Sequence, residues 1–225
     1  MIVTAAEILW SPDHDSHETL IKNHHLDDRT IAPDFVRVEI VPPGVDYTVP
    51  PDQWVYRVDQ DYLPAWYSAP EAELACRRVL PAWYAAHVVT DGDQVVQDGQ
   101  TRIALGHASQ TITGGEGWAY NSVTQVVTGG EGWACDHAGQ TINGGEGRAY
   151  DSATQTITGG EGRAYDSASQ TISGGEGWAF DSATQTINGG EGWAYDSASQ
   201  TITGGVGRAY GDATQTINGG QGRRG

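Results

Sequence analysis

A glutamine recurs every 15 residues through the second half of the chain, without one slip in register. Self-similarity at a fixed period is typical of repeat proteins in which each unit packs only against its neighbours. The unit reads Q-T-I-[TNS]-G-G-E-G-[WR]-A-Y-D-S-A-[TS], and residues 95–109 match it as a degenerate first copy. The eight glutamines are Gln110, Gln125, Gln140, Gln155, Gln170, Gln185, Gln200 and Gln215.

Each unit contains two alternating stretches separated by turn residues, which predicts two short strands per coil. A-T-Q-T-I-T and E-G-W-A-Y alternate, while G-G and D-S supply the turns. Strands this short cannot bury a face alone, so we expect the coils to stack in parallel and in register at ~4.8 Å. The fold class that we predict is mainly β: a two-strand-per-coil parallel β-solenoid of about eight coils over residues 95–220. A small α+β domain at 1–90 caps it, and residues 221–225 form a basic tail.

Substitutions within each column indicate which side chains face the core. The column of Trp118 also accepts Arg, which a dry core would not, so it faces outward and its Gly and Ala neighbours face inward. In the first strand Ile112 faces inward, flanked by Gln110 and Ala108, because the opposite choice buries three hydroxyls per coil. An internal Gln column is tolerated because stacked amides hydrogen-bond along the axis.

This assignment leaves columns of Thr on the outside of the first strand. Their spacing is ~4.8 Å along the solenoid and ~7 Å along the strand, which makes a flat lattice of methyl and hydroxyl groups. The columns also admit Ser and Asn, and Val126 interrupts one of them. The candidate ligand-binding residues on this face are Thr111, Thr113, Thr128, Thr141, Thr154, Thr156, Thr158, Thr171, Thr184, Thr186, Thr201, Thr203, Thr214 and Thr216.

The stretch A-Y-D-S-A-T-Q-T-I resembles the G-Y-G-S-T-Q-T-A signature of bacterial ice-nucleation repeats, and the Thr-x-Thr columns resemble those of β-solenoid antifreeze proteins. The resemblance covers the repeat half only, and it implies that the Thr lattice binds ice or ordered water. The unit departs from the family in having 15 rather than 16 residues and in placing Asn in one Thr column. Because nucleators have far more coils, growth inhibition is the expected form of this activity. The structural alternative is that Thr simply suits exposed strands.

The second strand carries outward Glu, Trp or Arg, and Tyr columns. Stacked aromatic rings with Arg over their faces form an exposed stripe, which predicts side-by-side homodimerisation or another protein partner. Stabilisation of the ladder within one chain is the alternative that stays open. The stripe residues are Trp118, Tyr120, Trp133, Arg148, Tyr150, Arg163, Tyr165, Trp178, Phe180, Trp193, Tyr195, Arg208 and Tyr210.

Charge and motifs argue against several other functions. The net charge of −17 divides into −10 for residues 1–105 (7 basic, 17 acidic) and −7 for the rest (5 basic, 12 acidic), which disfavours nucleic acid and anionic membranes as partners. A third possibility is an acidic rod that mimics DNA, although Arg in half of the coils weakens its negative electrostatic field. No signal peptide or membrane span is apparent, so we expect a cytoplasmic protein.

No catalytic set or cofactor motif is evident, so we expect no enzyme activity, no cofactor and no metal. G-G-E-G-W-A-Y-D differs from calcium-binding nonapeptides in the spacing of its Asp. One cluster has zinc-ligand chemistry without a matching spacing, and we interpret it as a solvated turn leading into a helix. Its members are Asp13, His14, Asp15, His17, Glu18, His24 and His25.

The first ninety residues contain three predicted elements. Residues 35–41 alternate as a strand, residues 53–58 form a second strand, and Ser68 caps a helix that runs to about His87. We expect Trp10, Trp54, Trp66 and Trp83 to supply the core of a domain that covers the open end of the solenoid.

Overall fold

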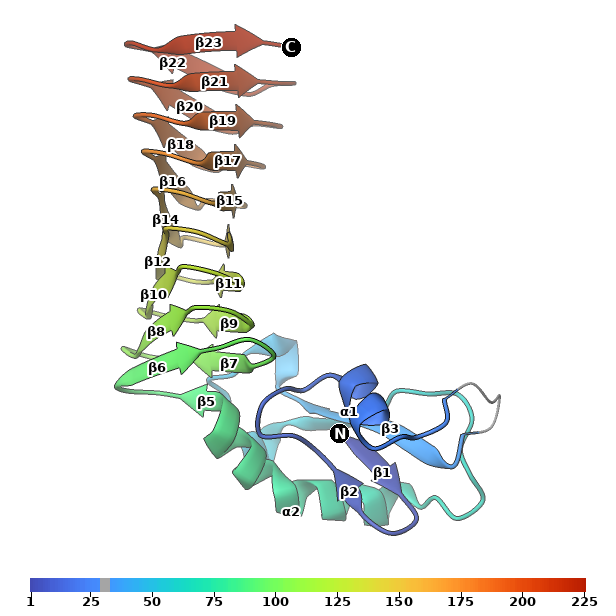
Figure 1. Ribbon diagram of the computed structural model, residues 1–225. Helices are drawn as coiled ribbons and strands as arrows, with labels where there is room; N and C mark the ends of the chain where they lie inside the picture. Colours follow the sequence, from blue (N-terminus) through green and yellow to red (C-terminus); the bar gives the residue numbers. More distant parts are fainter. Residues whose placement is uncertain (29–32) are drawn as a thin grey trace. The chain divides into compact units, whose positions relative to one another are not determined.

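The computed structural model describes residues 1–28 and 33–225, and the chain divides into two units, Met1–Val88 and Val89–Gly225 (Figure 1). The first is a small antiparallel sheet with helices. The second is a parallel β-solenoid, as the repeat predicts. The fold is therefore mainly β.

The first unit contains a four-stranded sheet in the order β2-β1-β3-β4, with antiparallel neighbours. The predicted strand at 35–41 and the predicted helix are confirmed as β3 and α2, whereas β4 begins two residues later than expected because a 3-10 turn precedes it. The elements are β1 (Ile2–Thr4), β2 (Ile8–Leu9), α1 (His17–Asn23), β3 (Phe35–Val41), η1 (Pro43–Val45), η2 (Pro51–Gln53), β4 (Val55–Val58) and α2 (Ala69–His87).

Only two of the four tryptophans assigned to this core are buried. Trp54 is 2% exposed, Trp83 is 9% exposed, and their ring centroids lie 6.0 Å apart, edge to face. Trp10 and Trp66 are half-buried, and the Trp66 indole N–H donates to Asp34 Oδ1 at 2.7 Å. An indole ring at the surface is stabilised by such a polar partner at one end.

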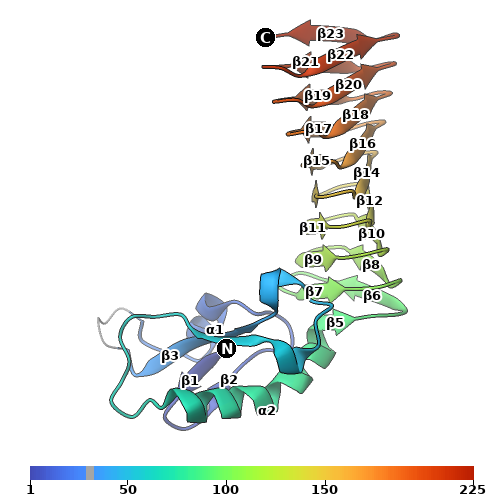
Figure 2. The same cartoon turned by 180° about the vertical axis from the view of Figure 1, so that it is seen from behind.

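The solenoid is built from two parallel sheets whose strands stack one above another, as Figure 1 shows and Figure 2 shows from behind. We call the nine-stranded one the threonine sheet and the ten-stranded one the aromatic sheet, after their outward side chains. The strands of the threonine sheet are β6 (Asp93–Val96), β8 (Ser109–Ile112), β10 (Thr124–Val127), β12 (Gly139–Ile142), β14 (Thr154–Ile157), β16 (Ser169–Ile172), β18 (Thr184–Ile187), β20 (Ser199–Ile202) and β22 (Thr214–Ile217). Those of the aromatic sheet are β5 (Val88–Val89), β7 (Thr101–Ala104), β9 (Glu116–Ala119), β11 (Glu131–Ala134), β13 (Glu146–Ala149), β15 (Glu161–Ala164), β17 (Glu176–Ala179), β19 (Glu191–Ala194), β21 (Val206–Ala209) and β23 (Gln221–Arg224).

Each residue pairs with its equivalent in the next coil, so identical side chains form columns along the axis. Gln155 pairs with Gln170 in the threonine sheet, and Gly162 pairs with Gly177 in the aromatic sheet. In-register parallel pairing satisfies every inner backbone group with a neighbouring coil, which single four-residue strands could not do.

The inward columns are those that the substitution pattern predicts. Ile142, Ile157 and Ile172 are fully buried and form one cluster with their repeats, while the Ala columns form a second cluster. The Gln column is buried too, at 0–2% exposure from Gln110 to Gln200. Small Ala and Gly on one side and Ile with Gln on the other fill a core too narrow for aromatic rings.

Two turn positions adopt the left-handed backbone conformation in nearly every coil. The second Gly of each G-G pair has a positive φ, such as 76° at Gly160, where a Cβ would approach the Gly145 carbonyl oxygen to 2.5 Å. The Asp that follows the aromatic column also has a positive φ, such as 55° at Asp166. Asp tolerates this region better than most residues, and the Asp166 carboxylate accepts a hydrogen bond from the Asp151 N–H at 3.4 Å.

Residues 221–225 are not a separate tail. Strand β23 continues the aromatic sheet, with Gln221 opposite Val206 and Arg224 opposite Ala209. The open edge of β21 offers unpaired N–H and C=O groups, so the chain completes one more strand despite its basic character. Arg224 thus lies at a register position that Ala occupies in the preceding strands of the aromatic sheet.

Candidate functional site

The threonine sheet presents two outward columns of hydroxyl side chains. One column consists of Thr residues from β12 to β22, each paired with its equivalent in the next strand. The other alternates Thr and Ser, all exposed. The first column comprises Thr141, Thr156, Thr171, Thr186, Thr201 and Thr216, and the second comprises Thr154, Ser169, Thr184, Ser199 and Thr214.

The two columns differ in their hydrogen bonds. In the second column, the Ser169 and Thr184 hydroxyls lie 3.1 Å apart, and the Thr214 hydroxyl donates to the Ser199 hydroxyl at 3.1 Å. Among the residues that the structure describes, the first column makes no side-chain hydrogen bond within the chain, and its members are half-buried or exposed. Its hydroxyls are therefore available to solvent on a regular sheet.

The lattice is continuous only over the last five strands, β14 to β22. Towards the N-terminal end, Val126 replaces Thr in the first column and Gly139 replaces Thr or Ser in the second. Thr111 lies on β8, beyond this interruption. Each of the five strands from β14 to β22 therefore carries two outward hydroxyl residues, one in each column.

Four predicted lattice residues lie just past the strands, in the bends. Each donates its hydroxyl hydrogen to a backbone carbonyl of the preceding coil, as Thr158 does to Ile142 at 3.3 Å and Thr203 to Ile187 at 3.2 Å. For Thr158 and Thr203 this single hydrogen is shared with the side-chain oxygen of an Asn of that coil. These hydroxyls stabilise the turns through hydrogen bonds within the chain. The Thr lattice that remains for a ligand therefore has two columns and not three. The four are Thr113, Thr128, Thr158 and Thr203.

The aromatic sheet carries an outward column of stacked indole and guanidinium groups. Trp118 and Trp133 stack with centroids 4.5 Å apart, and the Arg148 guanidinium lies 5.0 Å above the Trp133 ring. The arrangement repeats in the next four-coil block, where Arg208 lies 5.1 Å above the Trp193 ring. Arg163, the last residue of the first block, lies over Trp178 at 5.2 Å. Because in-register strands lie ~4.8 Å apart, planar side chains at equivalent positions of neighbouring coils are already at stacking distance.

A second stack runs beside the first along the aromatic column. Successive rings from Tyr150 to Tyr210 are parallel, with centroids 4.9–5.2 Å apart. Cys135 takes the place of a ring between Tyr120 and Tyr150, and burial raises the pKa of its thiol to about 12, with the charges of Asp151 and Asp136 adding to the effect. Burial likewise raises the pKa of Tyr150. All predicted stripe residues thus face outward, half-buried against one another.

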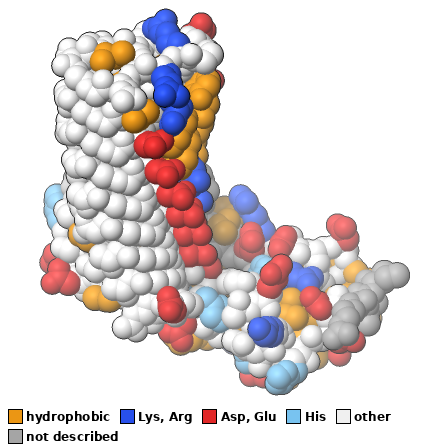
Figure 3. Space-filling view, turned by 45° about the horizontal axis from the view of Figure 1, so that its top comes forward, with side chains coloured by type: hydrophobic (Ala, Val, Ile, Leu, Met, Phe, Trp, Pro, Cys, Tyr) orange, Lys and Arg blue, Asp and Glu red, His pale blue; other side chains and the backbone are white. Residues whose placement is uncertain are grey.

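Carboxylates flank this stack and pair with its arginines. Arg148 donates to Glu131 Oε2 at 2.8 Å, and Arg208 donates to Glu191 Oε2 at 2.7 Å. Burial disfavours the charge of Arg148, but the hydrogen bond and the charge of Glu131 outweigh it and raise the arginine pKa. Figure 3 shows the acidic column between a broad uncharged surface and a column of hydrophobic side chains. The pairs partly neutralise the acidic field along this face.

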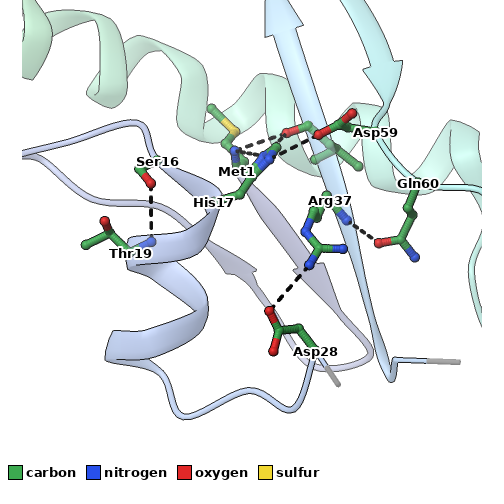
Figure 4. Close-up of polar contacts among 9 residues, drawn as sticks. Met1, Ser16, His17, Thr19, Asp28, Arg37, Asp59 and Gln60 are labelled. Carbon is green, nitrogen blue, oxygen red and sulfur yellow. Dashed lines mark hydrogen bonds and ion pairs between the residues drawn. The ribbon is translucent and has the colours of Figure 1, made fainter. Parts of the chain in front are cut away.

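Part of the His and Asp cluster precedes a helix, as expected: Asp13, His14 and Asp15 come before α1, whereas His24 and His25 follow its last residue. The Ser16 hydroxyl caps α1 by accepting a hydrogen bond from the Thr19 N–H at 3.3 Å. Within the described residues, His17 is the member of this cluster that meets carboxylates from distant elements, Glu39 in β3 and Asp59 just after β4. Figure 4 shows His17 beside Asp59. No periodicity links these three positions, so the sequence carried no signal for their meeting.

These features define the class of protein: a parallel β-solenoid of 15-residue repeats with an internal glutamine ladder and two laddered outer faces. Comparison with protein-family models, with curated proteins and with solved structures finds no match for the chain. Within the described residues, no helix has the length and apolar character needed to cross a membrane.

Proposed function

We propose that the protein is a non-enzymatic repeat protein whose threonine sheet binds ice or ordered water. The observation that supports this most is the column from Thr141 to Thr216, whose hydroxyls have no partner within the described part of the chain. Together with the Thr and Ser column beside it, it forms a grid of ~4.8 Å by ~6.7 Å.

Such a grid suits a ligand that is itself a lattice of hydrogen-bond donors and acceptors. Each Thr offers one hydroxyl, which donates and accepts, and one methyl group, which excludes loosely held water. The in-register backbone holds these groups in place before binding, so little side-chain entropy is lost on contact with a rigid surface. The resemblance of T-Q-T-I to the Thr arrays of ice-nucleation and antifreeze solenoids supports the same assignment.

Thermal hysteresis and ice-crystal shaping test this proposal. The double variant Thr171→Lys with Thr186→Lys places two charged side chains in the middle of the grid, and we expect it to lose both activities. Ser167→Lys with Ser182→Lys is the matched control, because these exposed turn residues accept the same charge change outside the grid. Absence of hysteresis in the native protein, or equal hysteresis in both variants, would overturn the proposal.

A second candidate function is side-by-side association through the aromatic sheet. The observation that favours it is the pair of stacked segments in this column, one from Trp118 to Arg148 and one from Arg163 to Arg208, which form a partly apolar ridge. The partner in that case is a second copy or another protein with a matching ridge. Light scattering over a range of concentrations distinguishes the two: a monomer at every concentration excludes the homodimer, whereas Trp133→Ala should weaken a genuine dimer.

A further inference from the structure

Three side chains with metal-ligand chemistry converge within the N-terminal unit. His17 is the first residue of α1, Glu39 lies in β3, and Asp59 directly follows β4. One ligand atom from each lies within 4.8 Å of the other two. Figure 4 shows His17 and Asp59 pointing toward each other beside Met1. The three come from separate elements, so this is a tertiary cluster and not a run of charged neighbours.

The orientation of the imidazole is set by the backbone. His17 Nε2 lies 3.1 Å from the Val38 carbonyl oxygen, and Nδ1 lies 3.4 Å from Asp59 Oδ2. When Nε2 carries the proton and donates to the Val38 carbonyl, Nδ1 has a lone pair directed at the Asp59 carboxylate. Two hydrogen-bond acceptors then face each other without a proton between them. A cation between them removes that conflict. Histidines that bind metals usually donate their other N–H to a carbonyl or carboxylate in this way.

The space beside the cluster is open and negatively charged. A cavity of ≈ 300 Å³ is lined by His17 and Glu39 together with Asp15, and by the aromatic residues Tyr47 and Trp54. Burial, followed by the charges of Asp15 and Glu39, raises the pKa of Tyr47 to about 12. Glu39 and Asp15 thus bring two carboxylates to the rim of this open space, and their negative charge favours a positive ion there.

We propose that His17, Glu39 and Asp59 bind one divalent zinc ion, with its remaining coordination position facing the cavity. One imidazole and two carboxylates match the ligands that zinc accepts, and the imidazole favours zinc over magnesium or calcium. Zinc bonds of ~2.0–2.2 Å require ligand atoms about 3–4 Å apart, so the side chains close by roughly an ångström. The Asp59 side chain is 56% exposed and is free to make this movement.

The alternative for the same atoms is a metal-free pair. The Met1 amino nitrogen lies 3.3 Å from His17 Nε2, so it can donate there while Nδ1–H donates to Asp59. In that arrangement the imidazole already has both partners, and zinc has no lone pair to bind. Zinc binding therefore separates the two arrangements directly.

Calorimetric titration of the full chain with zinc chloride tests the proposal, with magnesium chloride as the ion control. We expect one zinc ion per chain and no heat from magnesium. Asp59→Asn and Glu39→Gln keep side-chain shape and should each weaken zinc binding at least tenfold, on the order of what loss of a supporting group costs a metal site. His17→Ala should also weaken it, and circular dichroism reports whether that variant folds.

His24→Ala is the matched control, because His24 is a neighbouring histidine in sequence but lies at the exposed C-terminal end of α1. It should bind zinc as the native protein does. No zinc binding by the native chain, unchanged binding by Asp59→Asn, or loss of binding in His24→Ala would each overturn the assignment. These outcomes are independent of ice binding, because all four substitutions lie outside the solenoid.

Discussion

The Gln170 side-chain amide donates a hydrogen bond to the Gln155 side-chain oxygen at 2.6 Å. The same contact repeats in every coil, at 2.5–2.7 Å, from Gln94 to Gln215. Each buried carboxamide is thus both donor and acceptor along the axis. A shift by one residue would break all of these contacts and move the Gln column to the surface, so the ladder specifies register as well as stability.

Breaking this ladder in its middle should destabilise the solenoid strongly. Gln170→Leu leaves the Gln155 oxygen without this donor and removes one of the two acceptors of the Gln185 amide, which keeps the Gly177 carbonyl; each unsatisfied group costs about 1–3 kcal/mol. A lower urea midpoint, followed by circular dichroism, measures the effect. Gln215→Leu is the matched control, because Gln215 is half-buried and contacts a single neighbouring Gln, and it should cost clearly less. Equal losses would argue against the ladder as the source of stability.

The inward Gly of the aromatic sheet should not tolerate a methyl group. A Cβ on Gly162 would collide with the Gln155 side-chain oxygen and the Ile157 side chain, so Gly162→Ala should cost about 1–3 kcal/mol through overpacking. At Gly139 the nearest atom to an added Cβ is the Thr154 hydroxyl oxygen at 3.7 Å. Gly139→Ala should therefore be neutral or stabilising by up to about 1 kcal/mol. Thermal unfolding of the two variants in parallel checks the contrast, which would fail if both shifted alike.

Completing the aromatic column should stabilise the protein. Cys135→Tyr places a ring between Tyr120 and Tyr150 on the same register, where the next pairs already stack at 4.9–5.2 Å. Two new stacked contacts are worth about 0.5–1.5 kcal/mol each. A melting temperature that rises for Cys135→Tyr but not for Cys135→Ser is the expected result. A lower value for the Tyr variant would show that the column does not accept a ring there.

Both thiols should react slowly in the folded protein. Burial raises the pKa of Cys135 to about 12 and that of Cys76 to about 11, so little of the nucleophilic thiolate forms at about pH 8. Iodoacetamide labelling read by mass spectrometry should be far faster in urea than in buffer. The unfolded thiol loses its proton near its ordinary pKa of 9.0, so the contribution of Cys135 to the free energy of unfolding should fall as the pH rises from about 9 to about 12. Rapid labelling of native Cys135 would contradict this.

The repeat half could be predicted closely from sequence because each column is sampled many times. The exchange of Trp118 for Arg148 at one position indicates the outside, and the alternation of the strand then places Gly and Ala on the inside. The use of the Thr158 hydroxyl could not be predicted in this way. Its donation to the Ile142 carbonyl depends on where the strand ends, which the alternation of Thr and Ile does not specify.

The N-terminal unit offered no such redundancy. Trp54 and Trp66 look alike in sequence, yet one is buried and the other bonds Asp34 at the surface. His17 and Asp59 meet only because β3 and β4 pair and α1 packs beside them, a tertiary outcome without a local pattern. For residues 221–225 the local charge was misleading. Their basic residues predicted a tail, but backbone pairing with β21 makes residues 221–224 a strand of the aromatic sheet.

Partition into growing ice tests the central claim about the threonine sheet most directly. A dilute solution of the native chain is frozen slowly, and the protein in the ice fraction is compared with that left in the liquid. We predict that the native protein and the Ser167→Lys, Ser182→Lys control are enriched in ice, while the Thr171→Lys, Thr186→Lys variant stays in the liquid. Exclusion of the native protein from ice, to the same extent as the Thr variant, would contradict the account.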